Sequence, residues 1–214
     1  MFSKAANGTG EIEVILDSPG LTAETFTPDG TQLVVREAGR GGFDILLITL
    51  DEEPPLKQTL ITTDAFEWGS DLSHDGQWLA YASNETGRME IYVRPFPDIN
   101  GGKWLVSSEG GTEPLWGPEG RELFYRDGDA ILAVQIDTST GIRAGTPIEL
   151  FEGRFAESVD TSIPSYDVAP DGQRFLLMKD FNVEEARSSE TPLLVVENWF
   201  EELNRLAPPS ELAE

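Results

Sequence analysis

A short turn motif that recurs four times constrains this chain more than any other feature of its sequence. Each copy has an apolar residue, a small residue, Pro or His, an acid and Gly, in that order. Proline presets φ for the second position of a type I turn, the acid can accept hydrogen bonds from nearby backbone N–H groups, and glycine tolerates a left-handed exit. The motif therefore predicts a tight hairpin at each copy. The predicted turn residues are Pro28, Asp29, Gly30, His74, Asp75, Gly76, Pro118, Glu119, Gly120, Pro170, Asp171 and Gly172.

The spacing of the copies predicts the architecture. The acids at positions 29, 75, 119 and 171 are 46, 44 and 52 residues apart. Three residues after each Gly comes a core-type side chain, in turn Leu33, Leu79, Leu123 and Phe175. Repeats of about 40 to 50 residues built from short strands are typical of β-propeller blades, each with four strands. The fold class predicted is therefore all-β, a β-propeller of about four four-stranded blades.

The rest of the chain is divided by this repeat. We expect blades at residues 19–62, 63–108, 109–152 and 153–197, and a partial N-terminal blade at residues 1–18 whose two strands meet near Asn7 and Gly8. Asn198 can cap a short C-terminal helix over residues 198–206, because Glu201 follows three residues later. Residues 1–207 would then form a single propeller domain, and residues 208–214 a tail.

Ring closure has two readings. Blade four supplies only three predicted strands, so residues 11–16 could provide the fourth and close a four-bladed ring. Residues 1–7 would then compete with residues 192–196 for one place, and an incomplete, larger ring is the alternative. An open ring leaves unpaired strand edges, which invite pairing with another chain. A homo-oligomer that forms through these edges is therefore a further alternative.

Charge excludes some partners. Thirty-nine acids and fifteen bases give a formal net charge of −24, which repels phosphate backbones and anionic lipid. We therefore expect no nucleic acid partner, and no apolar run is long enough to insert into a membrane.

The absence of cysteine excludes disulfides and thiolate metal sites. We expect a cytoplasmic protein if Met1 is the true start, and a periplasmic or extracytoplasmic one if the chain is part of a larger receptor.

A family resemblance rests on specific segments. Residues 73–97, SHDGQWLAYASNETGRMEIYVRPFP, resemble the blade signature of TolB-like, WD-repeat-like β-propellers, although His74 stands where that family usually has proline. Four other segments resemble the C-terminal end of propellers attached to bacterial serine/threonine protein kinases. They are GGTEPLW (110–116), GRELFYR (120–126), YDVAPDGQRF (166–175) and NWFEEL (198–203). Such propellers usually have six or more blades, so the resemblance implies their last four and a half, without the kinase domain.

Catalytic motifs are not found. The chain has no Gly-rich phosphate loop and no HRD or DFG sequence, and Asp180-Phe181-Asn182 only approaches the last. A nucleophile elbow is missing too, and the single histidine, His74, lies in a blade turn where a buried base is rare. Asp127-Gly128-Asp129 is explained by a hairpin turn better than by a calcium loop. We therefore predict no catalytic, cofactor-binding or metal-binding residues and no enzymatic activity.

Binding residues are expected on the inner strands, because the central channel and its mouth are the usual binding place in a propeller. Tryptophans at blade positions are explained first as core between sheets. Inner-strand side chains can instead line the channel mouth. The candidates are Glu67, Trp68, Asp71, Glu113, Trp116 and Tyr166.

The functional hypothesis is a non-catalytic β-propeller module that recognises a protein, a peptide or a small ligand in its channel. It would be the sensory or scaffold part of a larger kinase-like or TolB-like protein. Two alternatives stay open. One is the gating propeller of a prolyl-oligopeptidase-type peptidase that lacks its hydrolase domain, and the other is a self-associating structural fragment.

Overall fold

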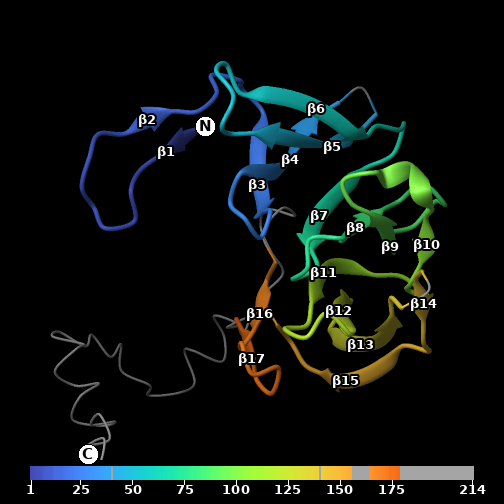
Figure 1. Cartoon of the computed structure of the whole chain (residues 1–214). Coiled ribbons are helices and arrows are strands. Elements are labelled where there is room, and N and C mark those ends of the chain that lie inside the picture. Colours follow the sequence, from blue (N-terminus) through green and yellow to red (C-terminus); the bar gives the residue numbers. More distant parts are fainter. Residues whose placement is uncertain (40, 140, 156–163, 179–214) are drawn as a thin grey trace, which may run out of the picture. The chain divides into compact units, whose positions relative to one another are not determined.

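The computed structural model describes residues 1–39, 41–139, 141–155 and 164–178, and the described part is built almost entirely from antiparallel strands (Figure 1). The short helical turn η1 (Ile99–Gly101) is the one helical element in these ranges. None of the described helices has the length and apolar character needed to cross a membrane.

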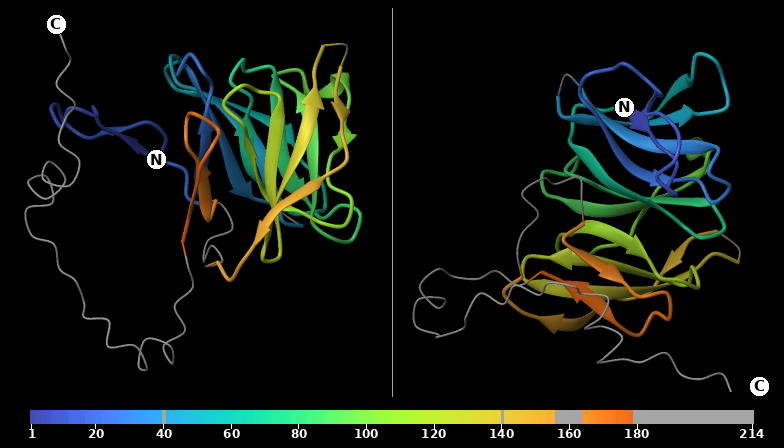
Figure 2. Two further views of the ribbon diagram at one scale, coloured as in Figure 1. Left: turned by 90° about the horizontal axis from the view of Figure 1, so that it is seen from below. Right: turned by 90° about the vertical axis from the view of Figure 1, so that its left-hand side faces the viewer.

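Three large sheets follow one another along the chain. The first has the order β3 (Leu21–Phe26), β4 (Gln32–Ala38), β5 (Phe43–Thr49), β6 (Leu56–Ile61). The second contains β7 (Glu67–Leu72), β8 (Trp78–Ser83), β9 (Glu90–Pro95) and β10 (Trp104–Leu105). The third contains β11 (Thr112–Trp116), β12 (Glu122–Asp127) and β13 (Ala130–Asp137), with both β14 (Arg143–Ala144) and β15 (Ile148–Glu152) paired to β13. Each sheet is antiparallel and built from strands that follow one another in sequence, as expected for a propeller blade, and the three sheets lie side by side (Figure 2).

Two smaller sheets flank them in sequence. β1 (Phe2–Ser3) pairs with β2 (Glu13–Val14), and β16 (Tyr166–Val168) pairs with β17 (Phe175–Leu177). Within the described ranges β2 pairs only with β1, so the alternative in which residues 11–16 complete the fourth blade is not what these ranges show. The Met1 ammonium group also donates to the Leu16 carbonyl at 2.6 Å, which adds a contact across this hairpin. The predicted strand at 192–196, the helix at 198–206 and the tail lie outside the described residues.

The repeated motif forms the predicted hairpin in all four places. The Gly76 N–H donates to the Ser73 carbonyl at 2.7 Å, and the Gly172 N–H donates to the Ala169 carbonyl at 2.8 Å, which closes a type I turn. The glycine that follows the acid has a φ between +66° and +72° in every copy. In three of the copies the acid accepts from the N–H two residues later, at 3.0 Å each, the acids being Asp29, Asp75 and Asp171. Among the described residues the Glu119 carboxylate of the third copy accepts no such bond.

Apolar side chains fill the space between successive sheets. Strand β4 is buried over consecutive residues because both of its faces are covered: Val34 packs towards the second sheet, while Leu33 and Val35 face the N-terminal segment. Burying one such side chain stabilises the fold by about 1.5 to 3 kcal/mol. The second and third sheets share the largest cluster, whose buried members are Ala80, Ala82, Ile91, Val93, Val106, Trp116, Leu123, Tyr125, Val134, Ile136 and Ile142.

Candidate functional site

The first strand of each large sheet is interrupted by a β-bulge. The register shifts between Ala23 and Thr25 in β3, between Trp68 and Asp71 in β7, and between Thr112 and Leu115 in β11. A bulge removes backbone groups from the ladder and re-aims side chains. An acidic residue lies in or at the edge of each shift: Glu24 in β3, Asp71 in β7 and Glu113 in β11.

These carboxylates join one sheet to the next by accepting from its backbone N–H groups. Glu24 of β3 accepts from the backbone N–H groups of Gly69 at 2.9 Å and Ser70 at 3.0 Å, both in the bulge of β7. Asp71 of β7 accepts from the N–H of Trp116 in β11 at 2.7 Å. Three successive inner strands are thus connected by charge-assisted hydrogen bonds.

The third junction repeats the arrangement with a larger network. Glu113, in the bulge of β11, has a φ of +54° and accepts from both the N–H and the hydroxyl of Ser165 at 2.7 Å. Arg126 donates to the Ser165 hydroxyl at 2.8 Å, and the Tyr166 hydroxyl donates to the Glu113 carbonyl, also at 2.8 Å. All four residues are buried. The left-handed conformation of Glu113, unfavourable for a residue with a side chain, is held by these contacts.

Burial changes the acidity of these groups. It raises the pKa of Asp71 to about 6, against the bonds from Trp116 and Leu72, and the nearby Asp167 carboxyl adds to the rise. Burial likewise raises the pKa of Glu24 above its usual value, although the N–H groups of Ser70 and Gly69 oppose it. The pKa of the Tyr166 hydroxyl lies well above its usual value for the same reason. A buried carboxyl of this kind changes protonation closer to neutral pH than an exposed one.

A small cavity opens beside the Asp71 junction. This cavity, the mouth pocket, has a volume of about 250 Å³. Asp71 and Asp167 supply carboxyl groups from β7 and β16, and His74 comes from a blade turn. The remaining lining residues are Leu72, Leu115, Trp116, Pro118, Val168 and Pro170. The pocket therefore combines two acids with a largely apolar wall.

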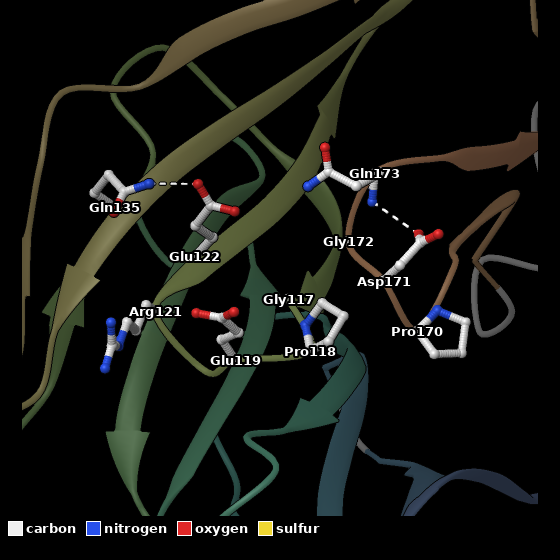
Figure 3. Close-up of a pocket in the computed structure, with 10 residues that line it drawn as sticks. All are labelled: Gly117, Pro118, Glu119, Arg121, Glu122, Gln135, Pro170, Asp171, Gly172 and Gln173. Carbon is white, nitrogen blue, oxygen red and sulfur yellow. Dashed lines mark hydrogen bonds between the residues drawn. The ribbon is translucent and has the colours of Figure 1, made fainter.

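A second cavity, the turn cleft, lies between the blade turns that precede β12 and β17 (Figure 3). Its volume is about 480 Å³. It shares Pro118 and Pro170 with the mouth pocket, so the two cavities adjoin. The other lining residues are Gly117, Glu119, Arg121, Glu122, Gln135, Asp171, Gly172 and Gln173.

The predicted channel-mouth residues are only partly brought together. Asp71 and Trp116 meet at the mouth pocket, whereas Glu113 and Tyr166 lie at the buried junction with β16. Glu67 is buried within the second sheet, where it accepts from the hydroxyls of Thr63 and Ser83. Trp68 packs with Phe43 and Phe66, at centroid distances of 6.5 and 6.2 Å. Neither Glu67 nor Trp68 lines the two cavities.

Sequence reasoning missed several lining residues. Asp167 precedes the turn acid Asp171 by four residues, as Asp71 precedes Asp75, and this spacing was the available signal. Arg121 and Glu122 directly follow the third turn, while Gln135 lies across the ladder from Glu122. No pattern in the sequence marks Gln135, because its place depends on the register of β12 and β13. Among the described residues no group of three or more His, Cys, Asp or Glu side chains is placed to hold a metal ion.

Comparison with known proteins bears on this arrangement. No family model matches the chain. It is 25% identical over 168 residues to an uncharacterized protein of Agrobacterium fabrum, an alignment that covers 74% of this chain and 55% of that one. A solved structure designated a candidate TolB of Agrobacterium tumefaciens is similar with a TM-score of 0.55 and 20% identity, over 78% of this chain and 62% of that one.

The chain has a TolB-like β-propeller fold. The sheets that begin with β3, β7, β11 and β16 are its blades, their first strands are its inner strands, and the turn motif joins the inner strand of each of these blades to the second. The propeller chain spans only 55% of the length of the curated relative and 62% of the length of the solved one.

Proposed function

We propose that this propeller is a non-catalytic recognition module that binds one side chain of a protein or peptide partner in the mouth pocket. The supporting observation is the pocket itself. Its volume of about 250 Å³ is below the roughly 300 to 1,000 Å³ of pockets that enclose whole small molecules. A pocket of this size suits a single side chain, and the rest of the partner would lie across the blade turns.

The charges around the pocket favour a basic side chain. Asp167 is exposed, and its carboxylate accepts only from the N–H of Val168 among the described residues. A lysine or arginine could place its alkyl stem against Leu115 and Val168 and its charged end near Asp167. The net charge of −24 would also accelerate the approach of a basic partner.

The working molecule in this proposal is longer than this chain. The lengths of the relatives support a larger propeller, and the resemblance to kinase-attached propellers suggests a sensory or scaffold role beside a kinase-like domain. The mass of the native product in its own cells, detected with an antibody to this chain, tests this part. A species much larger than 23.5 kDa is expected, and a species of that mass would contradict it.

Binding is tested with three blocked tripeptides that carry lysine, norleucine or glutamate at the centre. Nuclear magnetic resonance titration should show the lysine peptide shifting the signals of Leu115, Trp116 and Val168. Asp167→Asn should weaken this binding about two- to fivefold, the usual range for an exposed ion pair. Glu152→Gln is the control, since it removes the same charge from an exposed position on β15 that lines neither cavity.

Two outcomes would overturn the proposal. Equal binding of the lysine and glutamate peptides would show that the acids of the pocket do not select the ligand. Hydrolase or lyase turnover by the purified chain, abolished by a substitution in the pocket, would show an enzyme instead.

A further inference from the structure

The turn cleft differs from the mouth pocket in size and chemistry. At about 480 Å³ it falls within the range of cavities that take a complete small molecule. Polar side chains from two blades line it: Glu119, Arg121, Glu122 and Gln135 from the third, and Asp171 and Gln173 from the fourth. The rings of Pro118 and Pro170 add apolar surface. Figure 3 shows Glu119 and Arg121 on one side of Pro118, with Asp171 and Gln173 on the other.

Two of the charged groups are already engaged. Glu122 accepts from the side-chain amide of Gln135. Asp171 accepts from the N–H of Gln173 and from Arg174, at 3.0 Å each, and the first of these bonds is the main reason that its pKa lies below the usual value. Both carboxylates are therefore held in place, and the lowered pKa of Asp171 keeps that carboxylate ionised at neutral pH.

The two remaining charged groups are available to a ligand. Within residues 1–39, 41–139, 141–155 and 164–178, neither the Glu119 carboxylate nor the Arg121 guanidinium makes a hydrogen bond or an ion pair, and both residues are exposed. They have opposite charges, lie two positions apart in the chain and line one cavity, yet they do not pair with each other. The cleft thus offers an unengaged anion and an unengaged cation.

This combination selects among ligand classes. A dianion would face the carboxylates of Glu119, Glu122 and Asp171, and a dication would leave one of its charges near Arg121. A zwitterion can place an ammonium group near Glu119 and Asp171 and a carboxylate at Arg121. We propose that the turn cleft is a binding site for a small zwitterionic ligand of the amino-acid class, which would connect the third blade to β16 and β17.

Three probes of one chain length test the charge selectivity: the zwitterion δ-aminovalerate, the dication cadaverine and the dianion glutarate. In magnetic resonance and calorimetric titrations, δ-aminovalerate should bind best and shift the amide signals of Gly117, Gly120 and Gly172. Arg121→Gln should weaken its binding about tenfold, through loss of a charge-assisted hydrogen bond, and should make cadaverine the preferred probe. Glu119→Gln should weaken the binding of both δ-aminovalerate and cadaverine.

The controls separate the cleft from general charge effects and from the mouth pocket. Glu152→Gln should leave all three affinities unchanged, and Asp167→Asn should not alter δ-aminovalerate binding. The proposal is overturned if cadaverine or glutarate binds the unmodified chain as tightly as δ-aminovalerate. It is also overturned if Arg121→Gln leaves δ-aminovalerate affinity unchanged, or if no probe shifts the cleft signals at millimolar concentration.

Discussion

At the scale of single residues, hydrogen bonding and burial act in opposite directions on the pKa of the inner-strand carboxyl groups. Asp71 is hydrogen-bonded to the next blade, which favours its charge, yet burial opposes that charge more strongly and raises its pKa to about 6. The proton is therefore held more tightly in the folded protein than in the unfolded chain, where the usual value of 3.8 applies. Stability from this group is fully present below about pH 4 and is lost as the pH rises through about 6.

Asp71→Asn should remove this pH dependence. The amide oxygen can still accept from the Trp116 N–H, but the side chain no longer ionises. The free energy of unfolding of the variant relative to the unmodified chain should therefore rise between pH 4 and pH 7, by on the order of 1 to 3 kcal/mol. Urea denaturation at several pH values measures this difference in the free energy of unfolding. The contributions of Glu24 and of other groups that both proteins share cancel in it. A difference that does not vary with pH would contradict the assignment.

The turn glycines allow packing and backbone strain to be separated. Gly76 and Gly120 have the same φ of +66°, but a Cβ at Gly76 would lie 3.1 Å from Cδ of Pro28, whereas one at Gly120 would meet nothing within 4 Å. Replacement of either by alanine should cost about 1 to 2 kcal/mol from the left-handed backbone. Gly76→Ala should cost more, because it also pushes against the turn of the first blade. Thermal denaturation of both variants checks the order, and equal losses would show that the Pro28 contact yields freely.

At the scale of elements, a carboxylate on each of β3, β7 and β11 joins that inner strand to the next sheet or to the segment just before β16. In the receiving strand β7 the bulge leaves the N–H groups of Gly69 and Ser70 to Glu24, whereas Asp71 accepts from the N–H of Trp116, which lies just after the bulge of β11. Glu24→Ala should leave the N–H groups of Gly69 and Ser70 without their acceptor and cost about 2 to 3 kcal/mol. Glu24→Gln should cost less, since its amide oxygen keeps one bond. Chemical denaturation of the two variants distinguishes them, and equal costs would mean that solvent replaces the carboxylate.

The N-terminal hairpin covers one face of the first blade. Met1 and Leu16, with Leu21 and Leu50, pack on the cluster that contains Leu33 and Val35. Deletion of residues 1–18 should expose this apolar face, lower the thermal midpoint and promote association. Binding of a hydrophobic dye and size-exclusion chromatography measure the change. A monomer with the same midpoint as the full chain would show that the hairpin does not protect the blade.

At the scale of the whole molecule, the fold follows from repetition. Each blade buries its faces against neighbours, so the order of blades is set by the order of repeats along the chain. Within the described residues the first two blades have four strands each, and the sheet of β16 and β17 has two. The mouth pocket and the turn cleft both use residues of this last sheet, so ligands at either cavity should stabilise it.

The sequence by itself determined the all-β class and the four hairpins. Turn chemistry and the alternation of side chains depend on residues that are close together in the sequence. Pro28, Asp29 and Gly30, which form one turn, are an example. The sequence also marked Asp71 and Trp116 as inner-strand candidates. Only the tertiary structure decided that Asp71 and Trp116 meet at the mouth pocket, and that Glu67 and Trp68 line neither cavity. That outcome depends on bulges and on the register between blades, and therefore on contacts between residues about 45 positions apart.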